Sequence, residues 1–185
     1  MAVKPNSIRI QSGLFKGRTL SFPNRPGLRP ATGEMRETLF NWIRPQIDGM
    51  HVLDAFAGSG ALGFEALSQG AHSVKAYEID ELAYHAICDN LKRFPDNFSY
   101  ELTKGDFMVD CKQLETFDII FLDPPYDSNL LKEALFYLSD KINNHTLVFI
   151  HHSSSLEPNF DRWEILKSKQ RKKRCYALLK TKQKD

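Results

Sequence analysis

The sequence of 185 residues is poor in cysteine and has no long apolar run. Its three cysteines, Cys88, Cys111 and Cys175, are widely separated and form no C-x-x-C pair, which excludes a disulfide framework and disfavours a structural zinc site. The longer apolar runs, such as 119–122 and 147–150, are far shorter than the roughly 18 residues that span a bilayer. No apolar region typical of a secretory signal follows the first residues. We therefore expect a cytoplasmic globular protein without a metal and without a membrane partner.

Acidic residues are absent from the first 33 positions, which carry six Lys or Arg residues. The segment 162–185 is also basic, with ten Lys or Arg residues against two acids, whereas the part between them has a net charge of −12. Clustered positive charge attracts a polyanion at long range, so nucleic acid is the leading partner, and the alternative is two solvated basic ends. The residues expected to contact nucleic acid are Arg9, Lys16, Arg18, Arg29, Arg36, Arg171, Lys172, Lys173 and Arg174.

Alternating apolar and polar positions around two glycines predict a small β-hairpin within residues 8–22. A proline-rich connector follows, which continues neither a strand nor a helix. Thr32 then provides an N-cap for a helix that extends to about Ile43. We expect two domains, a basic hairpin with its connector at 1–31 and a main domain at 32–185.

Short apolar segments alternate with helical periods in the rest of the chain. The expected strands are near residues 52–56, 74–77, 100–103, 117–122, 147–150, 163–167 and 175–180. The expected helices are near 61–69, 80–94 and 130–141, and in the second of these Leu82, Ala86 and Leu91 are expected to face inward. The alternation predicts an α/β fold with a mostly parallel sheet, helices on both faces and a ligand site at the carboxyl ends of the strands.

A glycine-rich turn joins the first strand of the main domain to its helix. Glycine permits a positive φ and lets a ligand approach the backbone, and the helix N-terminus offers unpaired N–H groups. Asp54 at the end of the strand would repel a pyrophosphate, so the turn favours a ligand whose nearby group is cationic or hydroxylic. Glu78, at the end of the second strand, is placed to accept hydrogen bonds from ribose hydroxyls.

A third acid extends this pattern. Asp106, after the third strand, is placed to accept a hydrogen bond from an adenine amino group, with Phe107 packed on the ring. A nucleoside with a positive charge and no phosphate fits this set, which predicts S-adenosylmethionine as the cofactor and S-adenosylhomocysteine as its product. The alternative for Glu78 and Asp106 is a strand-end acid that caps a helix. The expected cofactor-binding residues are Asp54, Ala57, Gly58, Ser59, Gly60, Glu78, Asp106 and Phe107.

The most specific motif follows the fourth strand and reads Asp-Pro-Pro-Tyr. Two consecutive prolines restrict the backbone and lack N–H donors, so they present carbonyl acceptors in a fixed geometry. The exocyclic amino group of a nucleobase is a poor nucleophile because its lone pair is delocalised into the ring. A carboxylate and a carbonyl that accept its two hydrogens would direct the lone pair at a sulfonium methyl, and a tyrosine would stack on a base swung out of its helix. The alternative is a plain turn. The candidate catalytic residues are Asp123, Pro124, Pro125 and Tyr126.

At these two motifs the chain resembles the amino-directed class I methyltransferases, and more closely the bacterial 16S ribosomal RNA guanine-N2 methyltransferase family. The likeness covers nearly the whole chain, and beyond the motifs it is carried by residues 8–10, 13, 17–18, 27–32 and 36–42. It implies a Rossmann-like sheet of seven strands with a reversed last strand, and the donor and catalytic sites already named. His151 and His152 are a departure, since the family often carries an acid after the fifth strand, and we assign them no role.

The resemblance implies transfer of a methyl group from S-adenosylmethionine to N2 of a specific guanine in 16S ribosomal RNA. The enzyme is expected to be a monomer that recognises the RNA alone or an assembling small-subunit particle, with 1–31 as an RNA-binding appendage. Two alternatives stay open, namely adenine-N6 methylation of DNA or RNA and a non-catalytic nucleic-acid-binding protein with a residual donor site. A Rossmann dehydrogenase is disfavoured by Asp54 and by the Asp-Pro-Pro-Tyr motif.

Overall fold

The structure is a computed structural model that describes residues 5–24, 28, 31–125, 129–153 and 160–182. The strands are β1 (Asn6–Arg9), β2 (Thr19–Phe22), β3 (His51–Asp54), β4 (Ser73–Glu78), β5 (Tyr100–Lys104), β6 (Ile119–Leu122), β7 (Leu147–Ser153), β8 (Trp163–Arg171) and β9 (Arg174–Thr181). The helices are α1 (Gly33–Ile43), α2 (Ala61–Ser68), α3 (Glu81–Leu91), α4 (Phe107–Asp110), the 3-10 helix η1 (Leu114–Thr116) and α5 (Leu130–Leu138). None of the helices in this described part has the length and apolar character that crossing a membrane requires.

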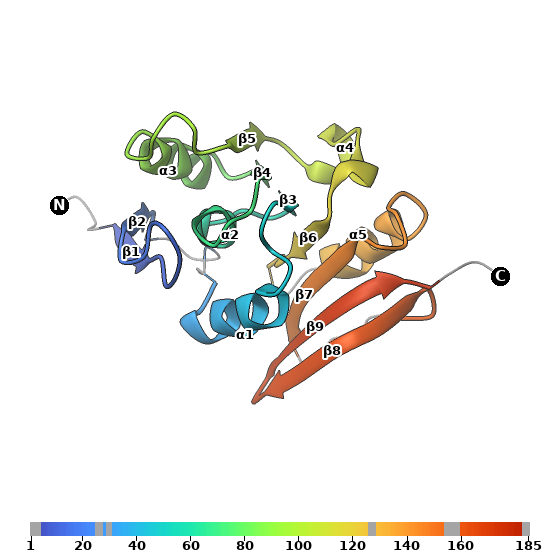
Figure 1. Cartoon of the computed structure of the whole chain (residues 1–185). Coiled ribbons are helices and arrows are strands. Elements are labelled where there is room, and N and C mark those ends of the chain that lie inside the picture. Colours follow the sequence, from blue (N-terminus) through green and yellow to red (C-terminus); the bar gives the residue numbers. More distant parts are fainter. Residues whose placement is uncertain (1–4, 25–27, 29–30, 126–128, 154–159, 183–185) are drawn as a thin grey trace.

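Seven strands form one sheet in the order β5-β4-β3-β6-β7-β9-β8, and β1 and β2 form a separate hairpin (Figure 1). The strands from β5 to β7 in this order pair in parallel, whereas β9 pairs antiparallel with both of its neighbours. The expected α/β architecture, with a mostly parallel sheet and a reversed last strand, is therefore confirmed.

Strand β6 packs against apolar side chains on both faces of the sheet. All four of its residues are buried, as expected for a continuous apolar strand in a parallel sheet. Ile119 and Phe121 pack in the same apolar cluster as residues of α1, α2, α3 and the hairpin. Ile120 and Leu122 point to the other face and pack in the cluster that contains residues of α4 and α5. The two clusters form the two layers of the core on either side of the sheet.

The elements expected after residue 32 are all present, with shifted ends. Helix α1 begins as predicted, because Thr32 is its N-cap and its Oγ1 accepts a hydrogen bond from Met35 N at 3.3 Å. The short helices α4 and η1 were not expected, since neither is long enough to show helical periodicity. Strands β8 and β9 are longer than predicted, so the basic segment 168–174 is mostly strand and only Lys172 and Lys173 form the turn.

One face assignment was partly wrong, although Leu91 of the expected inward face is half-buried and packs against the core. Leu82 is 53% exposed, and the buried positions of α3 are Ala83, Ile87 and Asn90. This face turns toward the hairpin, where the Asn90 side chain binds the backbone of β2 as a neighbouring strand would. Its Oδ1 accepts from Ser21 N at 3.0 Å and its Nδ2 donates to Ser21 O at 2.8 Å. The buried face of α3 thus includes a polar residue that binds β2, which an apolar pattern does not indicate.

A buried carboxylate forms part of the attachment of the hairpin to the main domain. Glu65 of α2 is fully buried and accepts backbone hydrogen bonds from Gln11 N and Ser12 N, each at 2.8 Å. Arg36 of α1 pairs with the same carboxylate at 3.0 Å and also donates to Arg9 O at 2.8 Å. Because apolar residues of the hairpin also join the core, the hairpin and the main sheet share one interior. The domain division at residue 31 stays a prediction.

We predict that Glu65→Ala destabilises the protein strongly, because it leaves the buried Arg36 guanidinium and two backbone N–H groups without their acceptor. Breaking a buried ion pair by removing one partner costs about 3 to 5 kcal/mol in the free energy of unfolding. Urea unfolding checks this value. The control is Glu101→Ala, which breaks a surface ion pair with Lys75 and should change the free energy of unfolding far less. Equal effects of the two variants would contradict the proposed attachment.

Candidate active site

Three acidic side chains meet at the carboxyl edge of the sheet. Asp54 is the last residue of β3, Glu78 is the last residue of β4, and Asp123 directly follows β6. In the parallel pairing Asp54 lies opposite Ala76 of β4 and Phe121 of β6, so Glu78 and Asp123 each lie two residues further along the flanking strands. The strand order therefore brings together acids that are far apart in the sequence, as expected at the carboxyl ends of parallel strands.

The glycine-rich turn at 55–60 connects β3 to α2 and contacts one of these acids. Gly58 and Gly60 have φ angles of 55° and 76°, which favour glycine. A Cβ atom on Gly60 would lie 3.0 Å from the Phe64 ring, so glycine makes room for that side chain. Gly58 instead turns its N–H toward the sheet edge, where it donates to Glu78 Oε2 at 2.6 Å. Ala57 and Ser59, the other two predicted residues of the turn, are buried.

Both carboxylate oxygens of Glu78 accept backbone hydrogen bonds. Besides Gly58, the N–H of Asp80 donates to Glu78 Oε1 at 2.7 Å. Burial raises the pKa of Glu78, and these two N–H donors oppose the increase. The helix-capping alternative does not hold for Glu78, because Asp80 caps α3 by accepting from Ala83 N at 2.9 Å. An ionised carboxylate has about four acceptor positions, so Glu78 retains capacity for ligand hydroxyls.

The capping alternative does hold for Asp106, and the prediction for Phe107 was wrong. Asp106 is the N-cap of α4 and accepts from Met108 N at 2.9 Å. Phe107 is fully buried, with its ring centroid 5.5 Å from that of Phe56 and 6.1 Å from that of Tyr137. Its ring belongs to the core beneath the sheet and is not presented to a ligand. The Phe107 side chain turns inward at the start of α4. A helix of four residues is too short to be recognised from the sequence pattern, so this orientation was not predicted.

An exposed apolar side chain stands where Phe107 was expected to act. Ile79 directly follows Glu78 and is 71% exposed. It precedes the N-cap of α3, so it lies on the same edge of the sheet as the acids. In the sequence, Ile79 is visible only as an apolar residue directly after a strand-end acid. That pattern alone did not assign Ile79 a role.

Asp54 lies deepest of the three acids. It is 1% exposed, and its Oδ2 accepts from Gly63 N at 3.2 Å. Burial, reinforced by the negative charges of Asp123 and Glu78, raises the pKa of Asp54 to about 7, although the Gly63 N–H opposes the increase. Three carboxylates are therefore close enough at this edge to disfavour a further negative charge beside Asp54. Such a site fits a cation or hydroxyl groups and does not fit a phosphate.

Asp123 is paired with a residue to which the sequence pattern assigned no role. Its Oδ1 lies 2.7 Å from Nδ1 of His151, in the neighbouring strand β7. The His151 ring is stacked on Tyr176, with the centroids 5.0 Å apart. Pro124 is buried and Pro125 is exposed, whereas the predicted stacking residue Tyr126 lies outside the described residues.

The basic segment at 171–174 lies at the same edge as Asp123. In the antiparallel pairing of β7 with β9, Arg174 lies opposite Ser153, close after His151. Lys172 and Lys173, which form the turn, are exposed. Arg171 pairs with Glu34 in the first turn of α1 at 3.4 Å. The structure therefore brings this predicted nucleic-acid contact close to the candidate catalytic residue.

Two basic residues of the hairpin, Lys16 and Arg18, lie elsewhere. Arg18 donates to Arg93 O at 2.8 Å, just beyond the end of α3, and Leu14 N donates to Ser68 O at 2.7 Å at the end of α2. Helices that follow parallel strands end at the amino edge of the sheet. The loop that contains Lys16 is therefore at the edge opposite Asp123, and Lys16 is exposed there.

The prediction that Arg36 contacts nucleic acid is contradicted. Its side chain is only 4% exposed and ion-paired with Glu65, so it presents no guanidinium to a phosphate. Its position on an amphipathic helix did not reveal this, because the partner is 29 residues away. Arg9 is exposed, and Arg29 lies outside the described residues.

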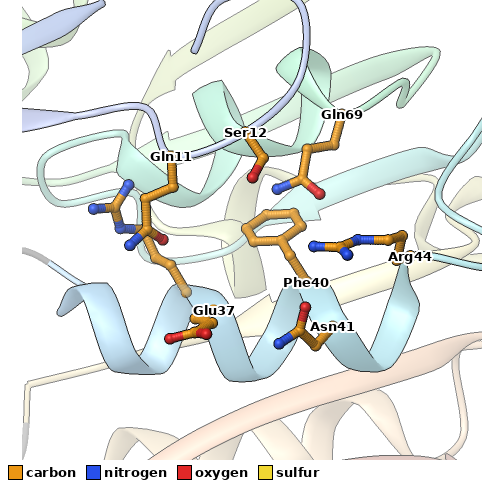
Figure 2. A pocket seen from close by; sticks show the side chains of 8 residues that line it. Gln11, Ser12, Glu37, Phe40, Asn41, Arg44 and Gln69 are labelled. Carbon is orange, nitrogen blue, oxygen red and sulfur yellow. The ribbon is translucent and has the colours of Figure 1, made fainter. Parts of the chain in front are cut away.

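A pocket of about 220 Å³ lies between the hairpin, α1 and α2. Figure 2 shows Phe40 pointing into it from α1, with Asn41 and Arg44 beside Phe40 and with Gln69 on the facing side. Among the predicted site residues that the structure describes, Arg36 alone lines this pocket. It is therefore separate from the acidic edge and does not form part of the candidate active site.

Comparison with known proteins decides the family. Residues 8–180 match the family described as "Conserved hypothetical protein 95". The Haemophilus influenzae protein named Ribosomal RNA small subunit methyltransferase D is 34% identical over 171 residues, which are 88% of this chain and 88% of that protein. The Escherichia coli K12 protein of the same name is 39% identical over 142 residues, which are 74% of this chain and 72% of that protein. This chain belongs to the small subunit methyltransferase D family.

Solved structures agree with this family assignment. The structure of yhhF from Escherichia coli has a TM-score of 0.81 and 32% identity, and the alignment covers 97% of this chain and 100% of that one. An RNA methyltransferase from Salinibacter ruber, solved in complex with S-adenosyl-L-homocysteine, shares the fold with a TM-score of 0.67 at 16% identity, over 85% of this chain and 96% of that one. As a member of the family, this chain is an S-adenosylmethionine-dependent methyltransferase, as its sequence predicted.

The raised pKa of Asp54 predicts a stability difference that depends on pH. In the folded protein Asp54 keeps its proton up to about pH 7, whereas the unfolded chain releases it near pH 4. Its contribution to stability is therefore complete below about pH 4 and is lost as the pH rises through about 7. Asp54→Asn stays neutral and keeps an oxygen for Gly63 N, so its stability relative to the parent should increase between pH 5 and pH 8.

Urea unfolding of the donor-free protein at the two pH values measures this difference. At about 1.4 kcal/mol per pH unit, the contribution that the parent loses between pH 5 and its folded pKa of about 7 is on the order of 3 kcal/mol. Asp96→Asn, a change of the same charge at an exposed position, is the matched control and should show little change with pH. If the difference in the free energy of unfolding between Asp54→Asn and the parent is the same at both pH values, the raised pKa of Asp54 is contradicted.

Proposed function

We propose that this chain transfers a methyl group from S-adenosylmethionine to the exocyclic N2 of a guanine in 16S ribosomal RNA. The observation that carries the proposal is the position of Asp123, followed by two prolines, beside the acids that end β3 and β4. The name shared by the relatives from Haemophilus influenzae and Escherichia coli supports ribosomal RNA of the small subunit as the substrate.

The residues of the acidic edge fit the methyl donor. Glu78 would accept hydrogen bonds from the ribose hydroxyls with its remaining lone pairs, and the backbone at Gly58 would line the site beside it. Ile79 would pack on the adenine ring in place of Phe107, while Asp106 would accept from the adenine amino group and still cap α4. When bound, S-adenosylmethionine supplies a methyl group on a positively charged sulfur, which suits an edge with excess negative charge.

Asp123 and Pro124 would act on the target amino group. The carboxylate of Asp123 and the carbonyl of Pro124 each accept one amino hydrogen, which directs the nitrogen lone pair toward the methyl carbon. Held in this way, the nitrogen would accept the methyl group that the bound donor supplies, and it would then lose one proton to solvent. Tyr126 would stack on the guanine ring.

The basic turn at 171–174 would hold the RNA backbone next to this edge. Lys and Arg at such a turn suit phosphate contacts, which position a nucleic acid without reading its sequence. The hairpin residues Arg9, Lys16 and Arg18 would contact a second part of the RNA or of an assembling particle, because Lys16 and Arg18 lie away from Asp123. We propose that a single chain carries out these contacts.

Methyl transfer onto RNA from a strain that lacks this protein tests the proposal. Labelled S-adenosylmethionine would be supplied with either free 16S ribosomal RNA or small-subunit particles, and the product nucleosides would be identified. N2-methylguanosine is the expected product. N6-methyladenosine would instead select adenine methylation, and no transfer to either substrate would support a binding protein with a residual donor site.

Asp123→Ala should lower kcat by orders of magnitude and leave the affinity for S-adenosylmethionine nearly unchanged, because Asp123 acts on the target amino group. Single-turnover transfer and calorimetry measure the two quantities. Asp96→Ala, at an exposed position away from the acidic edge, is the control. A variant that methylates at the parent rate would remove Asp123 from the mechanism.

Replacing both Lys172 and Lys173 by Gln should weaken RNA binding and reduce its dependence on salt. The slope of log affinity against log salt should fall by roughly 0.7 for each lysine–phosphate interaction that the substitutions remove, and donor affinity should not change. The matched control replaces Lys141 and Lys182, two exposed lysines just beyond the ends of α5 and β9, by Gln. If both double variants keep the parent slope, the turn does not contact RNA.

A further inference from the structure

We propose that His151 is a positioning residue for Asp123, fixing one carboxylate oxygen so that the other faces the target amino group. This inference rests on the proposed function, since it concerns the orientation of the group that would accept the amino hydrogens. The observation behind it is the 2.7 Å contact between His151 Nδ1 and Asp123 Oδ1. An ionised carboxylate only accepts hydrogen bonds, so the ring nitrogen is the donor in this pair.

The acids of the sheet edge are oriented in two different ways. Glu78, Asp54 and Asp106 each accept from backbone N–H groups. Asp123 is followed by Pro124 and Pro125, which have no N–H to donate. The two residues that follow Asp123 therefore offer it no N–H, and among the described residues the side chain that donates to it is His151 of β7.

The imidazole ring is itself held in place from two sides. The pairing of Leu122 with Ile150 places the next residues, Asp123 and His151, beside each other at the ends of β6 and β7. On the other side His151 lies opposite Tyr176 of β9, and the two rings are stacked at 5.0 Å with an angle of 30°. With the His151 side chain 5% exposed, the ring has little freedom to turn away from the carboxylate.

The two carboxylate oxygens of Asp123 therefore have different roles. Oδ1 is occupied by His151, and the Asp123 side chain keeps 19% of its surface exposed for a substrate. A hydrogen bond to one oxygen restricts rotation of the carboxylate, which matters because small misplacements of a reacting group reduce turnover greatly. His151 thus acts on the reaction through Asp123 and does not itself contact the substrate.

Two substitutions separate the N–H donor from the ring. His151→Phe keeps a ring that stacks on Tyr176 but has no donor, whereas His151→Asn has no ring but carries an amide N–H at the place of Nδ1. We expect His151→Phe to lower kcat by about 100-fold, with KM for RNA and the affinity for S-adenosylmethionine unchanged. His151→Asn should recover most of the missing turnover. Urea unfolding of both variants checks that each of them folds.

A double-variant comparison tests whether His151 acts through Asp123. In the Asp123→Ala background, His151→Phe should have almost no further effect on kcat, because the group it positions is already absent. A parent-like kcat for His151→Phe, an equal loss in His151→Asn, or an undiminished loss in the Asp123→Ala background would each overturn the proposal.

A spectroscopic measurement keeps this test independent of the proposed function. In the donor-free parent, the Nδ1 proton of His151 should give a downfield proton resonance that disappears in His151→Phe and shifts in Asp123→Asn. Absence of this resonance in the parent, or no change in Asp123→Asn, would overturn the positioning role whatever the substrate is. Conversely, the resonance together with failure of the parent to methylate ribosomal RNA would reject the proposed function and retain the pairing.

Discussion

The parallel pairing of β3 with β4 on one side and with β6 on the other is the constraint on which this site depends. It sets Asp54 between the ends of two strands, so that Glu78 and Asp123 lie on either side of it at one edge. The pairing in turn requires β6 to be apolar on both faces, because helices cover the sheet on both sides. The position of the acids is therefore a consequence of how the core is packed.

The same packing explains the electrostatics of the edge. Burial, reinforced by the negative charges of Asp123 and Glu78, raises the pKa of Asp54, and the N–H of Gly63 offsets only part of this increase. Such an arrangement lowers the stability of the free protein at neutral pH and favours a ligand that brings positive charge. A cationic methyl donor meets this requirement, whereas a dinucleotide, whose phosphates are negative, does not.

The two basic parts of the chain, which look equivalent in the sequence, differ in their place in the fold. The turn between β8 and β9 extends the edge that carries Asp123, because β9 returns antiparallel along β7. The hairpin is attached to α2 through Glu65 and reaches the ends of α2 and α3 at the opposite edge. An RNA that contacts both would have to extend around the side of the sheet.

The sequence by itself determined the alternation of strands and helices, the N-cap at Thr32 and the acids at the strand ends, because these depend on residues that are neighbours in the chain. It did not reveal that Phe107 and Arg36 are buried, or that His151 pairs with Asp123. Each of these depends on a partner that is distant in the sequence: Arg36 meets Glu65 across 29 positions, and His151 meets Asp123 across 28. The local sequence pattern indicates which residues can be buried or can bind a ligand. Which of these residues contact one another is decided by strand register and helix packing.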